Sequence, residues 1–354
     1  MTTEHQRLSV NQQKAIPLEQ WGPYLSERQW GTVREDYSMN GDAWNYFPFS
    51  QSHSRAYRWG EDGLAGICDF FGNLCFGIAL WNGKDKILKE RLFGAGNSEG
   101  NHGEDVKELY YYLDNIPTHY YMEYLYKYPQ QAFPYEDLLE KNRKRSKLEP
   151  EYEILDTGVF DNNEYFDVKV TYAKQNAKDI FIKIDVTNRA AKSAPVTVLP
   201  TLWFYNRWAY AGLDVKPEIK RLNKNAVQAS HYKLGNYYLY FQNADDALFT
   251  ENETNTEKVN QTPNATVFVK DAFHDAIIER KNLRVLRDKK SGTKFSPVYK
   301  LKIAAGATKT IYCRFTDQFT NKAFERGFEN VFVTRKNETN DFYASILPAG
   351  MDED

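Results

Sequence analysis

Cysteine is scarce in this 354-residue sequence, which contains three. Cys68 and Cys75 lie in the apolar stretches I-C-D-F-F and L-C-F-G, and Cys313 stands far from both. An odd number of cysteines does not build a disulfide framework, and the C-x-x-C or histidine spacing of a structural zinc site is missing. We therefore expect three buried, reduced thiols and no metal.

Long apolar runs and an excess of one charge are also missing. No apolar stretch approaches the ~18 residues that span a bilayer, and the start M-T-T-E-H-Q-R-L-S-V-N-Q-Q-K lacks the apolar segment of a secretory signal. The 46 Lys and Arg balance 48 Asp and Glu, for a net charge of −2. This balance gives no electrostatic case for nucleic acid or an anionic membrane as a partner. We expect a cytoplasmic protein.

The phosphate-loop motif is missing too. There is no G-x-x-x-x-G-K-[ST], and no cysteine lies in an activating context. We expect no cofactor. The basic run at residues 141–147 has acidic neighbours, so it predicts the solvated face of a helix rather than a nucleic-acid patch.

Aromatic residues, in contrast, are abundant at 15% of the chain, and they favour strands. Many short runs alternate apolar and polar residues without crossover helices, which is typical of antiparallel sheets. The sequence predicts a mainly β fold, a large antiparallel β-sandwich of the super-sandwich type. The expected strands lie at 63–69, 74–81, two within 109–128, then 165–173, 179–188, 195–204, 237–242, 265–270, 298–304 and 308–315.

Two turns and two helices complete the expected architecture. F-G-N-L at 71–74 and A-A-G-A-T at 304–308 predict hairpin connections. Residues 135–150 predict a short inserted helix that ends at Pro150, and residues 1–20 a polar start with one helical turn near 17–20. We expect residues 1–318 to form an N-terminal β-sandwich domain and 319–354 a helical linker.

The linker helix, at residues 321–347, has an apolar face. Phe324, Phe328, Val331 and Phe332 lie on that face. Little of the chain remains to bury it, so we expect the linker to lead to a further structure.

Five of the seven tryptophans fall between residues 21 and 81, each close to Gly, Asn, Arg or a carboxylate. Such a Trp is typical of a rim where a flat ring meets a sugar. R-W-G-E-D-G at 58–63 places Trp59, Glu61 and Asp62 in one turn, where carboxylates can accept hydrogen bonds from hydroxyl groups. A hairpin turn with solvated acids and a packed Trp fits the same residues.

The loop G-A-G-N-S-E-G-N-H-G-E-D at 94–105 is the second candidate. Its composition cannot build a core, and it fits a polyhydroxyl ligand better than a metal held by His102 with Glu99, Glu104 or Asp105. A glycine-rich connection without a ligand is the alternative. The W-F-Y-N-R-W segment at 203–208 predicts a strand end that packs on the partner sheet. The predicted substrate-binding residues are Trp59, Glu61, Asp62, Asn97, Glu99 and His102.

Several segments together resemble the long bacterial glucosidase-like proteins related to glycoside hydrolase family 63, the mannosyl-oligosaccharide glucosidases. The resemblance runs from about residue 20 to the end. It rests on W-G-P-Y-L-S-E-R-Q-W-G-T-V-R-E-D-Y-S (21–38), S-R-A-Y-R-W-G-E-D-G-L-A-G-I-C-D (54–69), L-W-N-G-K-D-K-I-L-K-E-R-L-F-G (80–94), N-S-E-G-N-H-G-E-D-V-K-E (97–108), Y-L-D-N-I-P-T-H-Y-Y-M (112–122), D-T-G-V-F-D (156–161) and L-P-T-L-W-F (199–204).

The resemblance implies an N-terminal β-sandwich that supports a C-terminal (α/α)6 barrel and lines one side of a cleft for an α-glucoside or oligosaccharide. The barrel would supply the acid and base of an inverting hydrolysis. This sequence stops where the barrel should begin, so we expect no catalytic residue in it, and inverting carboxyls ~6.5–9.5 Å apart cannot be assigned. A free-standing carbohydrate-binding module and an interaction or structural β-sandwich are the alternatives.

Overall fold

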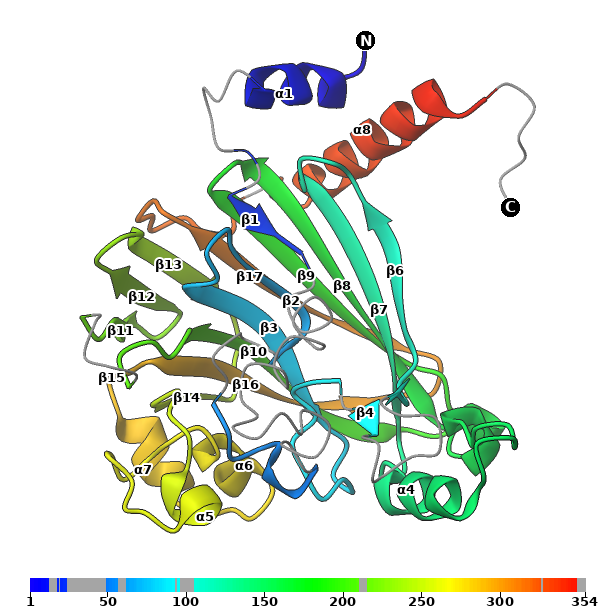
Figure 1. Cartoon of the computed structure of the whole chain (residues 1–354). Helices are drawn as coiled ribbons and strands as arrows, with labels where there is room; N and C mark the ends of the chain where they lie inside the picture. Colours follow the sequence, from blue (N-terminus) through cyan, green and yellow to red (C-terminus); the bar gives the residue numbers. More distant parts are fainter. Residues whose placement is uncertain are drawn as a thin grey trace.

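The computed structural model describes residues 1–12, 18, 20–23, 49–56, 62–92, 94–95, 105–209, 215–325 and 327–348. Within these ranges the chain is mainly β, and two large antiparallel sheets pack through a common core (Figure 1). The predicted fold class is therefore confirmed.

One sheet has six strands. Their order across it is β1 (Trp21–Gly22), β2 (Leu64–Asp69), β3 (Leu74–Trp81), β10 (Ala194–Phe204), β16 (Lys294–Ile303) and β14 (Asp246–Thr250). Strands from the start, middle and end of the chain are neighbours here. Trp81 is paired with Thr197, and Val198 is paired with Tyr299.

The other sheet has nine strands. Their order is β15 (Ser291–Gly292), β11 (Glu218–Asn223), β12 (Ala226–His231), β13 (Gly235–Phe241), β17 (Thr308–Thr316), β9 (Asp179–Asn188), β8 (Tyr165–Asn176), β7 (Tyr121–Pro129) and β6 (Tyr110–Asn115). A separate two-stranded ribbon joins β4 (Gly94–Ala95) to β5 (Asp105–Val106).

The aromatic residues explain how two such large sheets are held together. The core between them contains Phe76 from the six-stranded sheet and Tyr172 and Phe315 from the nine-stranded one. Trp21 belongs to this core: it is fully buried, its ring meets Phe315 edge-to-face at 4.7 Å, and its indole N–H donates to the hydroxyl of Tyr237. The rim position predicted for the early tryptophans is wrong for Trp21.

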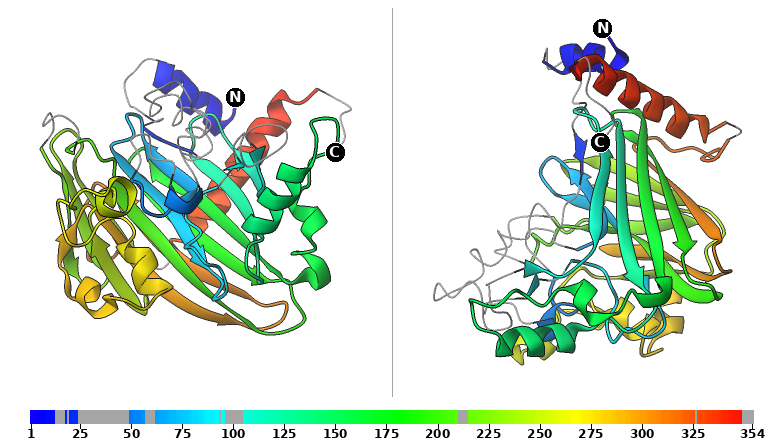
Figure 2. Two further views of the ribbon diagram at one scale, coloured as in Figure 1. Left: turned by 60° about the horizontal axis from the view of Figure 1, so that its bottom comes forward. Right: turned by 90° about the vertical axis from the view of Figure 1, so that its right-hand side faces the viewer.

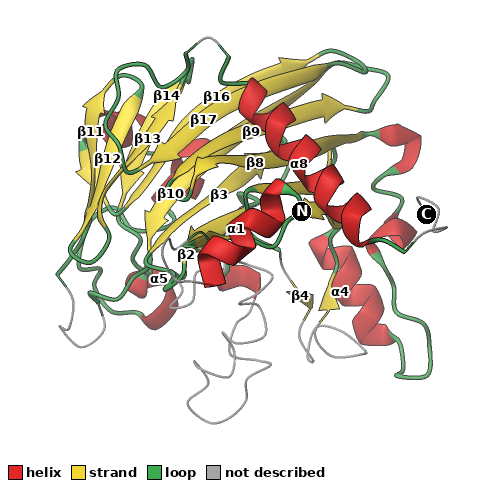
Figure 3. Ribbon diagram, turned by 90° about the horizontal axis from the view of Figure 1, so that it is seen from above, coloured by secondary structure: helices red, strands yellow, loops and turns green. Residues whose placement is uncertain are grey.

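Helices lie at both ends of the sandwich. At one end are α1 (Thr3–Gln12) and α8 (Asn330–Ile346), which contact each other (Figure 3). At the opposite end are α4 (Tyr135–Lys144), α5 (Thr256–Asn260), α6 (Ala272–Ile277) and α7 (Leu283–Asp288) (Figure 2). Short 3-10 turns occur at η1 (Phe49–Gln51), η2 (Ile154–Thr157) and η3 (Asp161–Asn163). No helix in the described ranges is long and apolar enough to cross a membrane.

Most predicted elements are confirmed. Residues 179–188 and 74–81 form strands with the expected bounds, and residues 109–128 contribute the hairpin of β6 and β7. The inserted helix is α4, but it ends at Lys144 rather than at Pro150, because Arg145 is extended. The turn at 71–74 joins β2 and β3 as an antiparallel hairpin. The three cysteines are free and buried, as expected.

One strand prediction and one hairpin prediction are wrong. Residues 265–270 form no strand, because Val267 is 85% exposed and the chain leads directly into α6. The turn at 304–308 is present, with Gly306 at φ +66°, but it is not a hairpin. It carries the chain from the six-stranded sheet to the nine-stranded one, so β16 and β17 pair with other strands.

The predictions for the two ends of the chain need correction. The polar start forms α1, whose buried Glu4 accepts hydrogen bonds from the backbone and hydroxyl of Thr118. The C-terminal helix begins at Asn330 rather than 321, and the predicted apolar face is half-buried against the sandwich. Phe332 lies 6.5 Å from Phe181 on the outer face of the nine-stranded sheet, and Phe342 is 6% exposed.

Candidate functional site

Four buried charged side chains meet where the six-stranded sheet faces α6, and we call them the ionic cluster: Asp62, Glu90, Lys270 and Lys294. Asp62 precedes β2, Glu90 follows β3, Lys270 precedes α6, and Lys294 begins β16. The ammonium of Lys270 lies 2.9 Å from Asp62 Oδ2 and 3.7 Å from Glu90 Oε1, and that of Lys294 lies 2.8 Å from Glu90 Oε2. Each side chain is at most 7% exposed.

The two carboxyls of the cluster respond differently to burial. Burial raises the pKa of Asp62, and the charge of Lys270 offsets this only in part. Burial acts in the same direction on Glu90, but Lys294 and Lys270 together hold its pKa below its ordinary value. The cluster is neutral when all four groups are charged, which is how buried charges are tolerated.

Lys270 also fixes the segment that precedes the tryptophan turn. Its ammonium donates to the backbone carbonyls of Ser52 and Arg55. Ser54 adds a hydrogen bond from its hydroxyl to Asp271, at 2.9 Å. Residues 52–55 and Asp62, which flank residues 57–61 in the sequence, are therefore anchored to the same lysine.

A glycine completes this end of the turn. Gly63 has φ +87°, and a Cβ added to it would lie 2.6 Å from the ring of Trp203 and 3.0 Å from Gly77 Cα. Its N–H donates to the backbone carbonyl of Glu90. Both the left-handed backbone and the close approach require glycine here.

The base of the second candidate loop is also fixed. Gly94 and Ala95 pair with Val106 and Asp105, which brings the two ends of the 96–104 segment together. Just outside this ribbon, buried Lys89 lies 2.6 Å from buried Glu108, which also accepts a hydrogen bond from the hydroxyl of Tyr126. Burial raises the pKa of Glu108 despite the neighbouring lysine.

Of the six predicted substrate-binding residues, Asp62 alone lies in the described ranges; Trp59, Glu61, Asn97, Glu99 and His102 lie outside them. The contacts of Asp62 are those of an anchor, since it is 4% exposed and both of its oxygens face Lys270. Its contact with a sugar stays a prediction. The glycine-rich composition predicted these loops, but nothing in the sequence linked them to Lys270 and Lys294.

The third tryptophan segment follows a strand end, as predicted, but Trp203 does not pack on the partner sheet. Trp203 is 2% exposed and packs with Cys68 and Cys75 at the end of β10. Trp208 donates its indole N–H to Glu253 at 2.8 Å. Cys68 and Cys75 lie in β2 and β3, on neighbouring strands of the same six-stranded sheet, so the predicted packing on the partner sheet is wrong for Trp203.

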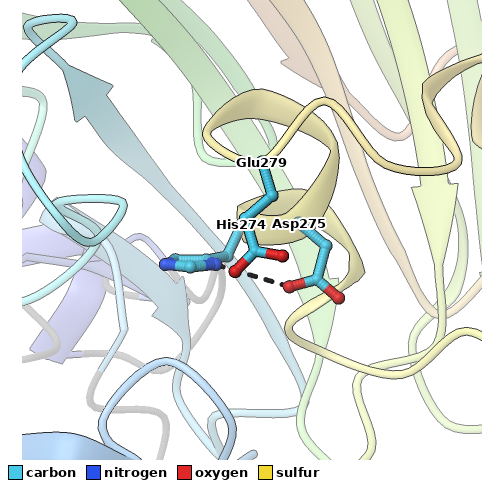
Figure 4. Close-up of side chains that lie close together, drawn as sticks. All are labelled: His274, Asp275 and Glu279. Carbon is cyan, nitrogen blue, oxygen red and sulfur yellow. Dashed lines mark ion pairs between the residues drawn. The ribbon is translucent and has the colours of Figure 1, made fainter.

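One group of side chains in the described ranges could hold a metal ion. His274, Asp275 and Glu279 come from α6 and the turn after it, and their donor atoms lie within 4.8 Å of one another (Figure 4). None of these three residues belongs to the metal site that the sequence offered as an alternative at His102, and His102 lies outside the described residues.

Two surface hollows in the described ranges lie away from the ionic cluster. One, of about 310 Å³, is lined by Asn223, Asn225, Tyr240, Gln242 and the 320–324 segment. Another, of about 750 Å³, lies along residues 261–267. Neither contains Asp62 or a member of the ionic cluster.

The fold and the cluster thus define a two-sheet, mainly β protein in which buried ion pairs lie beside the residues that flank the two candidate segments. No protein-family model matches the chain. An uncharacterized protein of Saccharomyces cerevisiae is 40% identical over 393 residues, which cover 98% of this chain and 36% of that protein. The chain therefore spans about a third of the length of this relative.

Among solved structures, a putative kojibiose phosphorylase from the human microbiome matches 52% of this chain and 20% of its own, with a TM-score of 0.25 and 9% sequence identity. A likeness at this level carries no argument about activity. The relative is fungal, so the similarity to bacterial glucosidase-like proteins stays a prediction.

Proposed function

We propose that this chain is the non-catalytic β-sandwich portion of an α-glucosidase-type glycoside hydrolase, and that it supports a helical catalytic barrel and forms one wall of the sugar cleft. The segments that resemble family 63 support the identity of the enzyme. The cleft wall would consist of the 57–62 turn and the 96–104 loop, with Trp59 stacking on a glucosyl ring and Glu61, Glu99, Asn97 and His102 accepting or donating hydrogen bonds.

One observation carries the proposal: the bases of the two segments are joined. Gly63 N–H donates to the carbonyl of Glu90, and the chain then runs from Glu90 to the β4–β5 ribbon that closes the second loop. Two glycine-rich, carboxylate-bearing segments thus leave the sandwich from neighbouring, rigid bases. A rigid base reduces the entropy lost when a loop binds its ligand.

Sugar binding by the chain can be tested with NMR. Indole and imidazole signals of Trp59 and His102 are recorded while an α-linked glucobiose is added, with Trp208 as the matched control because its indole N–H already bonds Glu253. We expect shifts at Trp59 and His102, none at Trp208, and weaker shifts in Glu99→Gln. A single wall should bind weakly, so unchanged signals of Trp59 and His102 at the highest soluble glucobiose concentration would contradict the cleft role.

Catalysis is tested separately. The chain should not hydrolyse aryl or oligosaccharide α-glucosides, because the acid and base are expected in the barrel. Robust turnover that Glu61→Gln or Glu99→Gln abolishes would place the chemistry in this chain. A free-standing binding module would instead give tight binding in calorimetry without any turnover.

A further inference from the structure

The imidazole of His274 has a defined tautomer. Its Nε2 lies 3.2 Å from the backbone carbonyl of Lys86, which can only accept a hydrogen bond. The ring proton of the neutral imidazole therefore belongs on Nε2, and Nδ1 carries a lone pair. The ring of His53 stacks on that of His274 at 4.3 Å between centroids and 21° between planes, which fixes the direction in which Nδ1 points.

That lone pair has no hydrogen-bond partner. His274 is 6% exposed, and its Nδ1 is buried and without a hydrogen bond. It faces Asp275 Oδ1 at 3.5 Å, which is also buried and without one (Figure 4). Two buried acceptors that face each other require a proton or a cation between them, because each otherwise loses its hydration without compensation.

Neighbouring lysines do not supply this cation at hydrogen-bond distance. Lys258 lies 3.7 Å from Asp275 Oδ1, while its hydrogen bond goes to Asp271 Oδ2 at 2.8 Å. Lys281 pairs with Glu279, but this pair is largely exposed to solvent and such pairs are weak. Glu279 can therefore exchange its lysine for a metal ion.

We propose that His274 Nδ1, Asp275 Oδ1 and a carboxylate oxygen of Glu279 bind a divalent transition-metal ion, with zinc as the best fit. The 3.5 Å between the first two donors matches the ~3.4 Å edge of a tetrahedron with metal–ligand bonds of about 2.1 Å. Glu279 completes three protein ligands by a rotation of its partly exposed side chain, and water takes the fourth position. An imidazole in the set disfavours Ca²⁺ and Mg²⁺, which prefer oxygen ligands.

The surroundings resemble those of bound metals in one further respect. A metal-bound histidine usually donates its other ring N–H to a carbonyl or carboxylate, and Lys86 provides this carbonyl. The ion would hold the imidazole of His274 in the position from which it contacts Lys86 and His53. Metal binding here does not depend on the proposed sugar site, because it uses no residue of the proposed cleft.

The test is calorimetric titration of the metal-free chain with ZnCl₂, repeated with CoCl₂ so that the absorption spectrum reports the coordination number. We expect one ion per chain and a four-coordinate cobalt spectrum. His274→Gln, Asp275→Asn and Glu279→Gln should each weaken zinc binding on the order of tenfold to a hundredfold. His231→Gln and Glu257→Gln are matched controls that remove a histidine and a carboxylate elsewhere, and they should leave the affinity unchanged.

Thermal unfolding gives a second readout. Zinc should raise the melting temperature of the parent chain and of both controls. It should raise the melting temperature of Glu279→Gln much less. Because the side chain of Glu279 is partly exposed, this substitution should not disturb folding. The proposal is overturned if Glu279→Gln and His231→Gln bind zinc alike, or if the parent chain binds none. It is also overturned if NMR finds a proton on His274 Nδ1 whether or not zinc is present.

Discussion

Replacing Lys270 with methionine should be among the most damaging single changes in the described core. The substitution keeps the length of the side chain and removes an ammonium that is fully buried. Asp62 would stay buried but would lose the partner that lies 2.9 Å from its Oδ2. The substitution would also remove the hydrogen bonds that the ammonium donates to the backbone carbonyls of Ser52 and Arg55.

The magnitude follows from this geometry. At 2.9 Å and an effective dielectric constant of about 20, Coulomb's law gives an attraction of about 6 kcal/mol. Desolvation of the ammonium offsets part of it, and removal of one partner of a buried pair usually costs about 3–5 kcal/mol. Against a total stability of about 5–15 kcal/mol, this loss would leave the chain marginal.

Urea unfolding followed by circular dichroism measures the effect. We expect Lys270→Met to lower the free energy of unfolding by about 3–5 kcal/mol, and the double change with Asp62→Asn to recover about 1–3 kcal/mol. Lys300→Met is the control, because its lysine is 51% exposed and Asp246 retains Arg287 as a partner. A loss below about 1 kcal/mol, or additive effects in the double variant, would refute the reasoning.

Three further predictions concern buried groups in the framework of the sandwich. Burial raises the pKa of Glu108 in the folded state, so its contribution to stability is present below its ordinary value of 4.5 and is lost as pH rises through the folded value. Urea unfolding from pH 4.5 upward should show the parent chain losing stability relative to Glu108→Gln, and an opposite slope would contradict the assignment. Gly63→Ala should cost about 3 kcal/mol or more, because φ is +87° and the new Cβ would lie 2.6 Å from an indole ring. Gly72→Ala, at φ +67° with nothing within 4 Å, should cost about 1 kcal/mol, and similar losses for both glycines would argue against the close packing. Phe342→Ala should cost about 3–5 kcal/mol and make α8 sensitive to protease, while Val333→Ala, at 61% exposure, should change stability by about 0.5 kcal/mol or less.

The sequence predicted the sandwich where side-chain alternation is strict. In β9, Lys183, Asp185 and Thr187 lie between fully buried residues, so the period of two is visible without the structure. It failed where a local pattern competes with tertiary structure. A-T-V-F-V-K at 265–270 has the residues of a strand, yet Lys270 is drawn into the ionic cluster and the chain turns into α6.

The ends of the chain show a second kind of failure. α1 has no apolar periodicity, and its buried residue is Glu4, whose partner Thr118 is more than a hundred positions away. The same separation hides the ionic cluster, because Asp62 and Lys270 become neighbours only in the folded chain. Sequence composition indicated the segments that could bind a sugar. The charged side chains that anchor the residues flanking those segments could not be predicted, because they lie far apart in the sequence.

The crossing of the chain between sheets after β16 has a consequence for the order of folding. β16 lies between β10 and β14, and β17 lies between β13 and β9, so two consecutive strands are central in different sheets. Neither sheet is complete until β16 and β17 are in place. Both strands pair with strands that the ribosome synthesises much earlier. The loops would therefore gain their rigid bases late, in a slow, strongly non-local folding reaction. A nascent chain interrupted before residue 294 would lack Lys294, and with it a partner for Glu90.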